Sequence, residues 1–331
     1  MPSSNACYIG VDLGGTTIKF ALIDNDGNVL QRSRCLTEGD EGHDAVLERM
    51  IAGARDISAL AEPGQVIRAV GVAAPGVLDM ERGYTLFLPN LPGDWPDVPV
   101  GPRMSEALGL PVFLINDVRA FTVAELEIGA AKGVQTALCY AIGTGIGGGI
   151  VAHGRVNMGL GGAGGELGHM IVNTAGRHCG CGNQGCAEAY AAGPAIIGDA
   201  NRLIVMGETT ILREMIGEDL NKMTPELVER AAADGDPIAR QVLDFAGFHM
   251  GIAISNAISA LAPNVVVLGG GVLKPYGYYW EQIEKAARAH CHVTEIDKIE
   301  FRPAQLGFES GVVGAALWAK SEYERTQDLD S

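Results

Sequence analysis

The segment from Gly159 to Glu188, GLGGAGGELGHMIVNTAGRHCGCGNQGCAE, constrains the fold of this chain more than any other. Its first eleven residues contain six glycines, together with Glu166 and His169. Each glycine loses extra backbone entropy when it is ordered, so this density does not suit the interior of a helix or strand. Glycine is favoured where backbone must pass close to a ligand. The segment therefore predicts a binding loop.

Three cysteines follow in the pattern C-x-C-x4-C, at Cys179, Cys181 and Cys186. Zinc takes four nitrogen or sulfur ligands in a tetrahedron, and thiols bind it as thiolates. His178 directly precedes Cys179, and two adjacent residues chelate one ion awkwardly, so His169 is the better fourth ligand. Four protein ligands leave no open position for water, which predicts a structural zinc rather than a catalytic one. The alternative is three ordinary thiols in a reducing cytosol.

Composition indicates an α/β protein with many tight turns. The chain has 331 residues, enough for two domains, with 47% hydrophobic residues, 6% aromatic residues and 46 glycines. A net charge of −16 argues against a nucleic-acid partner, which would require clustered Lys and Arg.

The same sequence predicts a cytoplasmic protein with no membrane segment. Four further cysteines are scattered, which fits a reduced cytosolic protein better than a disulfide framework: Cys7, Cys35, Cys139 and Cys291. The N-terminus lacks a basic segment followed by a long apolar run, so we expect no signal peptide. No uninterrupted apolar run approaches the ~18–20 residues that cross a bilayer.

Glycine turns suited to phosphate recur along the chain. The segment Tyr8 to Asp24 predicts two strands, and backbone N–H groups and hydroxyls gather at their turn, on Gly14, Gly15, Thr16 and Thr17. Asp12, just before this turn, could hold a hydrated Mg²⁺. Lys19 could approach phosphate or stay solvated, and the hairpin could also be an ordinary turn.

Two later segments extend this pattern. Thr136 to Gly154 again predicts strand, glycine turn and strand, with the Thr144 hydroxyl in the turn, and indicates an internal duplication. Two such hairpins could clamp a polyphosphate. The buried strand from Asn264 runs into a third glycine turn, suited to a nucleotide base and ribose, at Gly269, Gly270 and Gly271.

An acid stands at the end of a predicted buried strand. VFLIND, residues 112–117, ends in Asn116 and Asp117 and enters a helix predicted over residues 118–131. In open α/β sheets ligands gather at the carboxyl ends of strands, so Asp117 is either a helix cap or a general base. Loops also open at Gly76 and around Asn90, where proline and glycine predict a lid or a pocket wall.

Together these motifs resemble the ROK family (repressor, open reading frame, kinase), and within it most closely the bacterial ATP-dependent glucokinases. The motifs, in order, are DLGGTTIKFALID, APG, PNLPGDW, NDVRAFTVAE, GTGIGGGIV, GELGH, CGCGNQGCAE, VVVLGGGV and SGVVGAA. The resemblance implies an α/β, actin/hexokinase-like (ribonuclease H-like) fold, a duplicated two-domain ATPase with a cleft between its lobes. It implies a small lobe over residues 1–117, with a helix at about 311–331 packing back on it. The larger lobe would cover residues 118–310, with the zinc knuckle at 169–186.

The resemblance also implies roles for particular residues. Asp117 would be the base that deprotonates the 6-hydroxyl of a sugar, with Asn116 holding neighbouring hydroxyls. The ring would be bound by Glu166, His169 and Glu188, with Gly76 and Asn90 on the opposite wall. His169 would use one ring nitrogen for zinc and the other for sugar. ATP with catalytic Mg²⁺ would be bound by Asp12, Gly14, Gly15, Thr16, Thr17, Thr144, Gly145, Gly269, Gly270 and Gly271.

The implied activity is phosphorylation of glucose by ATP in a homo-oligomer, a dimer or tetramer. Many family members have Asn two residues after the catalytic Asp, whereas this chain has Arg119, which puts the neighbouring sugar contacts in question. The alternatives are N-acetylmannosamine, N-acetylglucosamine or fructose as the acceptor, and, from another class, a sugar-sensing regulator.

Overall fold

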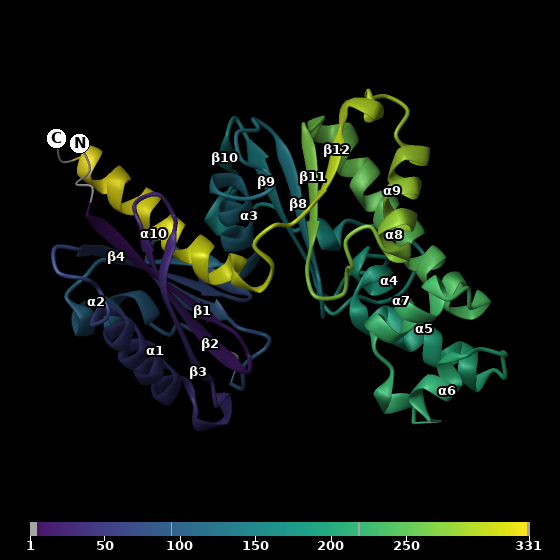
Figure 1. The fold of residues 1–331 in the computed structure, drawn as a ribbon, viewed down its shortest axis with the longest axis horizontal. Coiled ribbons are helices and arrows are strands. Elements are labelled where there is room, and N and C mark those ends of the chain that lie inside the picture. Colours follow the sequence, from purple (N-terminus) through teal and green to yellow (C-terminus); the bar gives the residue numbers. More distant parts are fainter. Residues whose placement is uncertain (1–4, 94, 218, 330–331) are drawn as a thin grey trace. The chain divides into compact units, whose positions relative to one another are not determined.

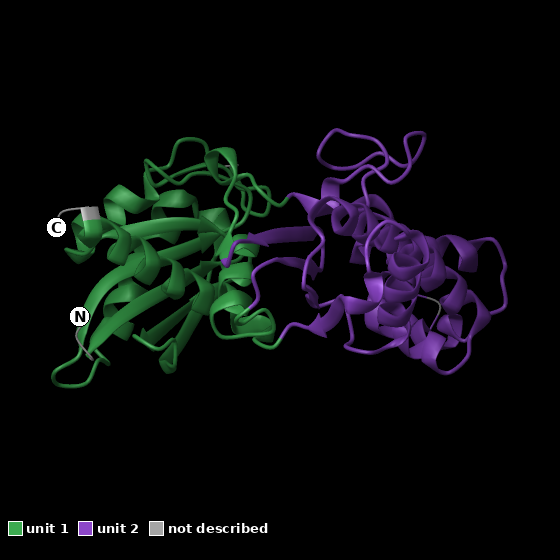
Figure 2. Cartoon of the chain, turned by 90° about the horizontal axis from the view of Figure 1, so that it is seen from above, with its two compact units in different colours: residues 1–133, 155–165, 305–331 green, residues 134–154, 166–304 purple. Residues whose placement is uncertain are grey.

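The computed structural model describes residues 5–93, 95–217 and 219–329, which divide into two compact units (Figures 1 and 2). Unit 1 is built from Met1–Gly133, Arg155–Gly165 and Gln305–Ser331, and unit 2 from Val134–Gly154 and Glu166–Ala304. These bounds differ from the lobes expected at 1–117 and 118–310. The first boundary between the units lies after Gly133 rather than after residue 117, because helix α3 (Asp117–Glu127) packs against α10 (Ser310–Leu329) inside unit 1.

Unit 1 contains a five-stranded sheet in the order β3-β2-β1-β4-β7. The strands are β1 (Ala6–Leu13), β2 (Thr17–Asp24), β3 (Val29–Leu36), β4 (Val66–Ala74) and β7 (Val112–Asn116). β1, β2 and β3 pair antiparallel, while β4 and β7 continue the sheet parallel to β1. Smaller elements of this unit are β5 (Val77–Asp79), β6 (Tyr84–Phe87), β10 (Arg155–Val156), η1 (Gly39–Glu41), η2 (Leu160–Gly162) and η6 (Gly307–Glu309).

Helices cover both faces of this sheet because the side chains of a strand alternate between faces. Ile9 and Val11 of β1 join the core under α1 (His43–Ser58) and α2 (Val100–Leu108). Tyr8, on the opposite face, joins the core formed by α3 and α10. Figure 1 shows α10, in yellow, alongside β1 and β4. The last helix thus returns to the N-terminal sheet, as the resemblance implies.

Unit 2 repeats the same pattern: an antiparallel hairpin followed by parallel strands. Its neighbouring strands run in the order β9-β8-β11-β12, with bounds β8 (Ala137–Ile142), β9 (Ile146–Ala152), β11 (Val265–Gly269) and β12 (Glu300–Pro303). β11 is parallel to β8, as β4 is to β1 in unit 1. The repeated glycine hairpins of the sequence therefore correspond to a repeated structural motif.

Four helices of unit 2 pack against α8 (Pro237–Leu261), which is long and apolar enough by length and composition to cross a bilayer. However, 67% of its apolar window is buried within the protein, which identifies it as a core helix. These four are α4 (Glu188–Ala191), α5 (Gly193–Val205), α7 (Pro225–Ala233) and α9 (Tyr278–His290), and the unit also contains α6 (Leu212–Ile216). Short 3-10 turns lie at η3 (Leu167–His169), η4 (Leu220–Lys222) and η5 (Ile296–Lys298).

Candidate functional site

The first glycine hairpin, in unit 1, is fixed by main-chain contacts around its turn. Gly14 N–H donates to Thr17 O at 3.1 Å, and the Thr37 hydroxyl donates to Gly14 O at 2.7 Å. Thr17 is the first residue of β2, so the turn itself consists of Gly14, Gly15 and Thr16. A Cβ on Gly15 would lie only 2.9 Å from Asn90 O. The predicted phosphate turn and the predicted wall residue Asn90 are thus adjacent.

Asp12 and Lys19 form an ion pair beside this turn. Asp12 Oδ2 lies 3.0 Å from Lys19 Nζ, which also donates to Phe308 O at 3.1 Å. The Asp12 side chain is 14% exposed, and Gly311 at the start of α10 packs against its carboxylate. From the sequence, Lys19 could lie near phosphate or stay solvated. In the structure its ammonium group instead pairs with Asp12, the carboxylate predicted to hold Mg²⁺.

Asn116 and Asp117 lie at the junction of β7 and α3. Asn116 is the N-cap, and its Oδ1 accepts from the N–H groups of Val118 at 3.0 Å and Arg119 at 3.4 Å. Asp117 is the first residue of the helix, and its Oδ1 accepts from Val118 N–H at 2.9 Å. Asn116 Nδ2 donates to Gly76 O at 3.1 Å. The capping role therefore belongs to Asn116, which also fixes the predicted wall residue Gly76.

In unit 2 the second and third glycine turns meet at the end of β8. Gly143 N–H donates to Gly145 O at 2.8 Å across the turn that carries the exposed Thr144. Gly270, with φ +99°, packs so closely on β8 that a Cβ would lie 2.2 Å from Ile142 O. Both predicted nucleotide turns therefore lie at one end of one sheet.

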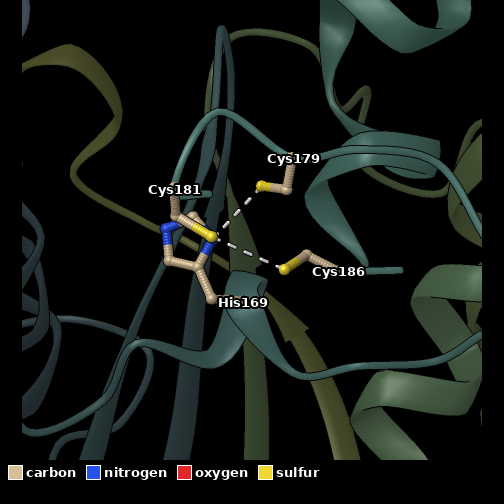
Figure 3. A group of neighbouring side chains, drawn as sticks. All are labelled: His169, Cys179, Cys181 and Cys186. Atoms are coloured by element: carbon tan, nitrogen blue, oxygen red, sulfur yellow. Dashed lines mark hydrogen bonds between the residues drawn. The ribbon is translucent and has the colours of Figure 1, made fainter. Parts of the chain in front are cut away.

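Four predicted metal ligands converge in unit 2 (Figure 3). The ligand atoms of His169, Cys179, Cys181 and Cys186 all lie within 4.8 Å of one another. Cys179 Sγ is 3.6 Å from His169 Nδ1, and Cys181 Sγ is 3.7 Å from Cys186 Sγ. A zinc tetrahedron with bonds of about 2.3 Å needs edges of about 3.8 Å, so these residues fit the ion. His178 is not in the group; its backbone forms an isolated antiparallel β-bridge with Gln184.

The thiols of this cluster differ in their readiness to ionise. Burial, reinforced by the neighbouring thiols, raises the pKa of Cys186 to about 12, and burial also raises the pKa of Cys179. A hydrogen bond from the Asn183 backbone lowers the pKa of Cys181. A cation bound here must therefore displace protons, which couples metal affinity to pH.

Two glutamates lie on either side of the His169 ring. Glu188, the first residue of α4, accepts from Ile146 N–H through Oε2 at 2.8 Å. Its Oε1 lies 3.5 Å from Cys179 Sγ and 4.0 Å from His169 Nδ1. Glu166 Oε2 lies 3.9 Å from the other ring nitrogen, Nε2. The predicted ring-binding residues of this unit, the metal ligands and the second glycine hairpin are therefore contiguous.

A supporting cluster behind the cysteines was missed by sequence reasoning. Arg177 N–H donates to the Tyr190 hydroxyl at 2.7 Å, and its guanidinium donates to both carboxylate oxygens of Asp199, at 2.9 and 2.7 Å. The Tyr190 ring stacks on His249 at 4.1 Å. These residues are far apart in the sequence, and α8 meets the cysteine loop only through tertiary packing, so no local sequence pattern indicates the cluster. The cluster attaches that loop to α5 and α8.

Comparisons with known proteins match this arrangement over nearly the whole chain. A model of the ROK family matches residues 8–322. The chain is 32% identical to the glucokinase of Halalkalibacterium halodurans over 331 residues, or 98% of each chain. A ROK hexokinase structure from Thermus thermophilus is 36% identical with a TM-score of 0.82, covering 96% of this chain and 99% of that one. A ROK family glucokinase from Streptomyces griseus, solved with glucose and AMPPNP, is 31% identical with a TM-score of 0.78, covering 95% and 99%.

Proposed function

The chain belongs to the ROK family, and from this premise we propose that it transfers the γ-phosphoryl group of ATP to the 6-hydroxyl of glucose. Its α/β architecture is the hexokinase/actin-like ATPase fold expected from the motifs. Phosphoryl transfer requires alignment, charge neutralisation and a base more than covalent chemistry.

The observation that carries the proposal is the position of Glu188. One oxygen of its carboxylate accepts from the second glycine hairpin at Ile146, and the other lies next to His169 and Cys179. The Glu188 side chain thus connects the turn proposed to bind phosphate with the residues proposed to bind the sugar. Glu166, on the far side of the imidazole, adds a second acceptor for hydroxyl groups. Carboxylates suit a polyhydroxyl ligand because each can accept several hydrogen bonds.

In unit 1 we assign Asp117 as the general base. The hydrogen bond from Val118 N–H orients its carboxylate at the start of α3, where it would accept the proton of a sugar hydroxyl. Asn116 would bind a neighbouring hydroxyl, with Gly76 and Asn90 forming the wall beside it.

The nucleotide would be held mainly by backbone. Gly14, Gly15 and Thr16 in unit 1, with Thr144 and Gly145 in unit 2, offer N–H groups and hydroxyls to phosphates, and Gly269 to Gly271 would face adenosine. Asp12 would hold hydrated Mg²⁺, which supplies neutralisation of phosphate charge when bound. Lys19 already neutralises Asp12, so the two side chains would rearrange when a metal–nucleotide complex binds.

We assign the cluster of His169 and the three cysteines to a structural zinc. The set is closed by four protein ligands, and it fixes the imidazole so that Nε2 faces Glu166.

The proposal also includes a cytoplasmic location, no nucleic-acid partner, and a homo-oligomer whose mass light scattering would measure.

A substrate panel with ATP and Mg²⁺, followed by ADP release, tests this function. We expect glucose to give the highest kcat/KM, and NMR of the product to locate phosphate on the 6-oxygen. N-acetylmannosamine, N-acetylglucosamine and fructose are the competing acceptors. A higher kcat/KM for one of them would reassign the acceptor and keep the kinase. Sugar binding without turnover on any acceptor would instead favour a sugar-sensing regulator.

A further inference from the structure

Arg119 is a buried cation in the first turn of α3. The residue is only 2% exposed, although arginine is among the residue types least often buried. A positive charge at a helix N-terminus also meets the positive end of the helix dipole. Both effects disfavour arginine here, so its presence requires a specific compensating interaction.

Arg119 contacts the residue that precedes the candidate base. Its Nη1 donates to Asn116 Oδ1 at 3.1 Å, and the same oxygen accepts from the backbone N–H groups of Val118 at 3.0 Å and of Arg119 itself at 3.4 Å. An amide oxygen has two lone pairs, so these donors saturate it, and the guanidinium is the only charged one among them. If the Asn116 amide were flipped, its NH₂ group would face three donors, one of them a cation, which is unfavourable. The Arg119 side chain therefore reinforces the one orientation of this amide that the helix cap favours.

The selected orientation directs the amide nitrogen of Asn116 away from the helix. Nδ2 donates one hydrogen to Gly76 O at 3.1 Å. Gly76 cannot move easily to accommodate another orientation, because its φ is +81° and a Cβ would lie 2.1 Å from Phe87 O. Arg119, Asn116 and Gly76 thus form a continuous hydrogen-bonded chain from α3 to the loop after β4.

We propose that Arg119 is a positioning residue for sugar recognition, which holds the Asn116 amide so that its second N–H is presented to an acceptor oxygen of the sugar. The ligand group is then a hydroxyl that accepts a hydrogen bond from Asn116. This inference rests on the proposed function and deepens it. It assigns a role to the position at which this chain departs from the Asn of many family members.

The first test compares R119Q, R119K and wild type by steady-state kinetics. We expect R119Q to raise the KM for glucose by about 10- to 100-fold, because the amide loses its fixed orientation. The KM for ATP should change by less than about threefold, since a local sugar contact is altered. R119K keeps a cationic donor and should recover part of the loss. R55Q is the matched control, because Arg55 donates to Ala107 O between α1 and α2.

A double-mutant cycle distinguishes positioning from general stabilisation. If Arg119 acts through Asn116, R119Q should change the glucose KM by less than about twofold when N116A is already present. An equal change in both backgrounds would overturn the proposal, as would an equal rise in both KM values for R119Q. If R119Q does not fold, R119K carries the same cycle and is judged by the same additivity.

Calorimetric titration of glucose without ATP separates this inference from the proposed function. Binding by the wild type, weakened in R119Q and insensitive to R119Q in the N116A background, supports the positioning role even if turnover is absent. Should another sugar of the panel bind best, the same cycle applies to that sugar. Unchanged affinity in R119Q, with active wild-type enzyme, would refute the role of Arg119 alone.

Discussion

At the scale of single residues, Asp117 carries the clearest prediction. Asp117→Asn should retain glucose and ATP binding and lose about 10²- to 10⁴-fold in kcat, the usual cost of removing a general base. The amide oxygen of Asn can still accept from Val118 N–H, so the start of α3 should be preserved. Calorimetry for both ligands and a coupled assay would measure the two effects.

The control for Asp117 is Asp79→Asn, a carboxylate paired with Arg82 elsewhere in unit 1. Near-normal turnover of the Asp117 variant would remove this residue from the mechanism. Loss of binding together with turnover would instead indicate a role in forming the site.

His249 carries a prediction about pH. Burial lowers its pKa in the folded protein, so the folded state keeps the imidazole neutral, whereas the unfolded chain titrates near 6.5. Below that pH the unfolded state binds a proton that the folded state does not, and stability falls as pH falls. His249→Phe, which keeps a ring on Tyr190, should lose less stability than wild type between pH 7.5 and 5.5 in urea unfolding. The exposed His292→Gln is the control, and a wild-type-like pH dependence in His249→Phe would contradict the assignment.

Candidate residues were predictable where chemistry and position coincide along the chain. Asp117 follows an apolar strand directly, and the cysteines lie within one short loop, so spacing alone marked both as candidates, whereas the base role of Asp117 came only from the resemblance. The ion pair of Lys19 with Asp12 and the contact of Arg119 with Asn116 depend on rotamers and packing. Arg177, Tyr190 and His249 come from different elements, and no local pattern brings them together.

At the scale of elements, the cysteine loop is the segment most dependent on its metal. We expect one zinc per chain, and Cys181→Ser should abolish it because Cys181 Sγ lies 3.7 Å from Cys186 Sγ within the cluster. When the free zinc concentration is about 1,000 times the dissociation constant, losing the site lowers the free energy of unfolding by about 4 kcal/mol and Tm by about 10 °C. Sugar affinity should fall too, since the loop orients His169 and ends at Glu188. Elemental analysis, thermal unfolding and glucose titration measure these outcomes.

Cys35→Ser is the matched control for the metal prediction, because Cys35 lies on β3 in the other unit. Zinc-free protein, purified without chelator and as stable as wild type, would refute the zinc assignment. A Cys181→Ser variant that retains stoichiometric zinc would refute the ligand set.

Element boundaries were less predictable than element types. The apolar pattern of residues 247–261 by itself predicts a helix, and these residues form the second half of α8, which begins ten residues earlier at Pro237. The start signal was local: Asp236 accepts from two N–H groups of the first turn and Pro237 follows it. The helix expected over residues 118–131 ends at Glu127. Beyond it, Ala130 N–H donates to the Glu125 side chain, Oε2, instead of to a helical carbonyl.

At the scale of the molecule, unit 1 is assembled from three separate stretches of the chain. Glu125, fully buried in α3, accepts from the N–H groups of Gln305 and Leu306, where the chain returns to unit 1. The first half of α10 is apolar, but this pattern does not identify the sheet that it covers. The resemblance to a known family supplied that return, whereas local sequence signals did not.

The return of α10 leads to a prediction about folding. On the α10 face of the sheet, a Cβ on Gly10 would lie 1.9 Å from Val312 O, and one on Gly71 would lie 1.8 Å from Ala315 O. The helix therefore lies directly on the strands. Burying Val312, Val313 and Leu317 contributes about 1.5–3 kcal/mol each, which is comparable to the entire stability of about 5–15 kcal/mol of a typical domain.

Residues 1–133 expressed alone should consequently fail to fold, whereas the same fragment joined by a flexible linker to residues 305–331 should unfold cooperatively. Circular dichroism during urea titration and the dispersion of amide resonances would compare the two. The linked fragment carrying Val312→Asp is the control, because an unpaired charge on the buried face should restore the unfolded state. Cooperative unfolding of residues 1–133 alone would show that the sheet needs only α1, α2 and α3, and that α10 is an accessory rather than a part of its core.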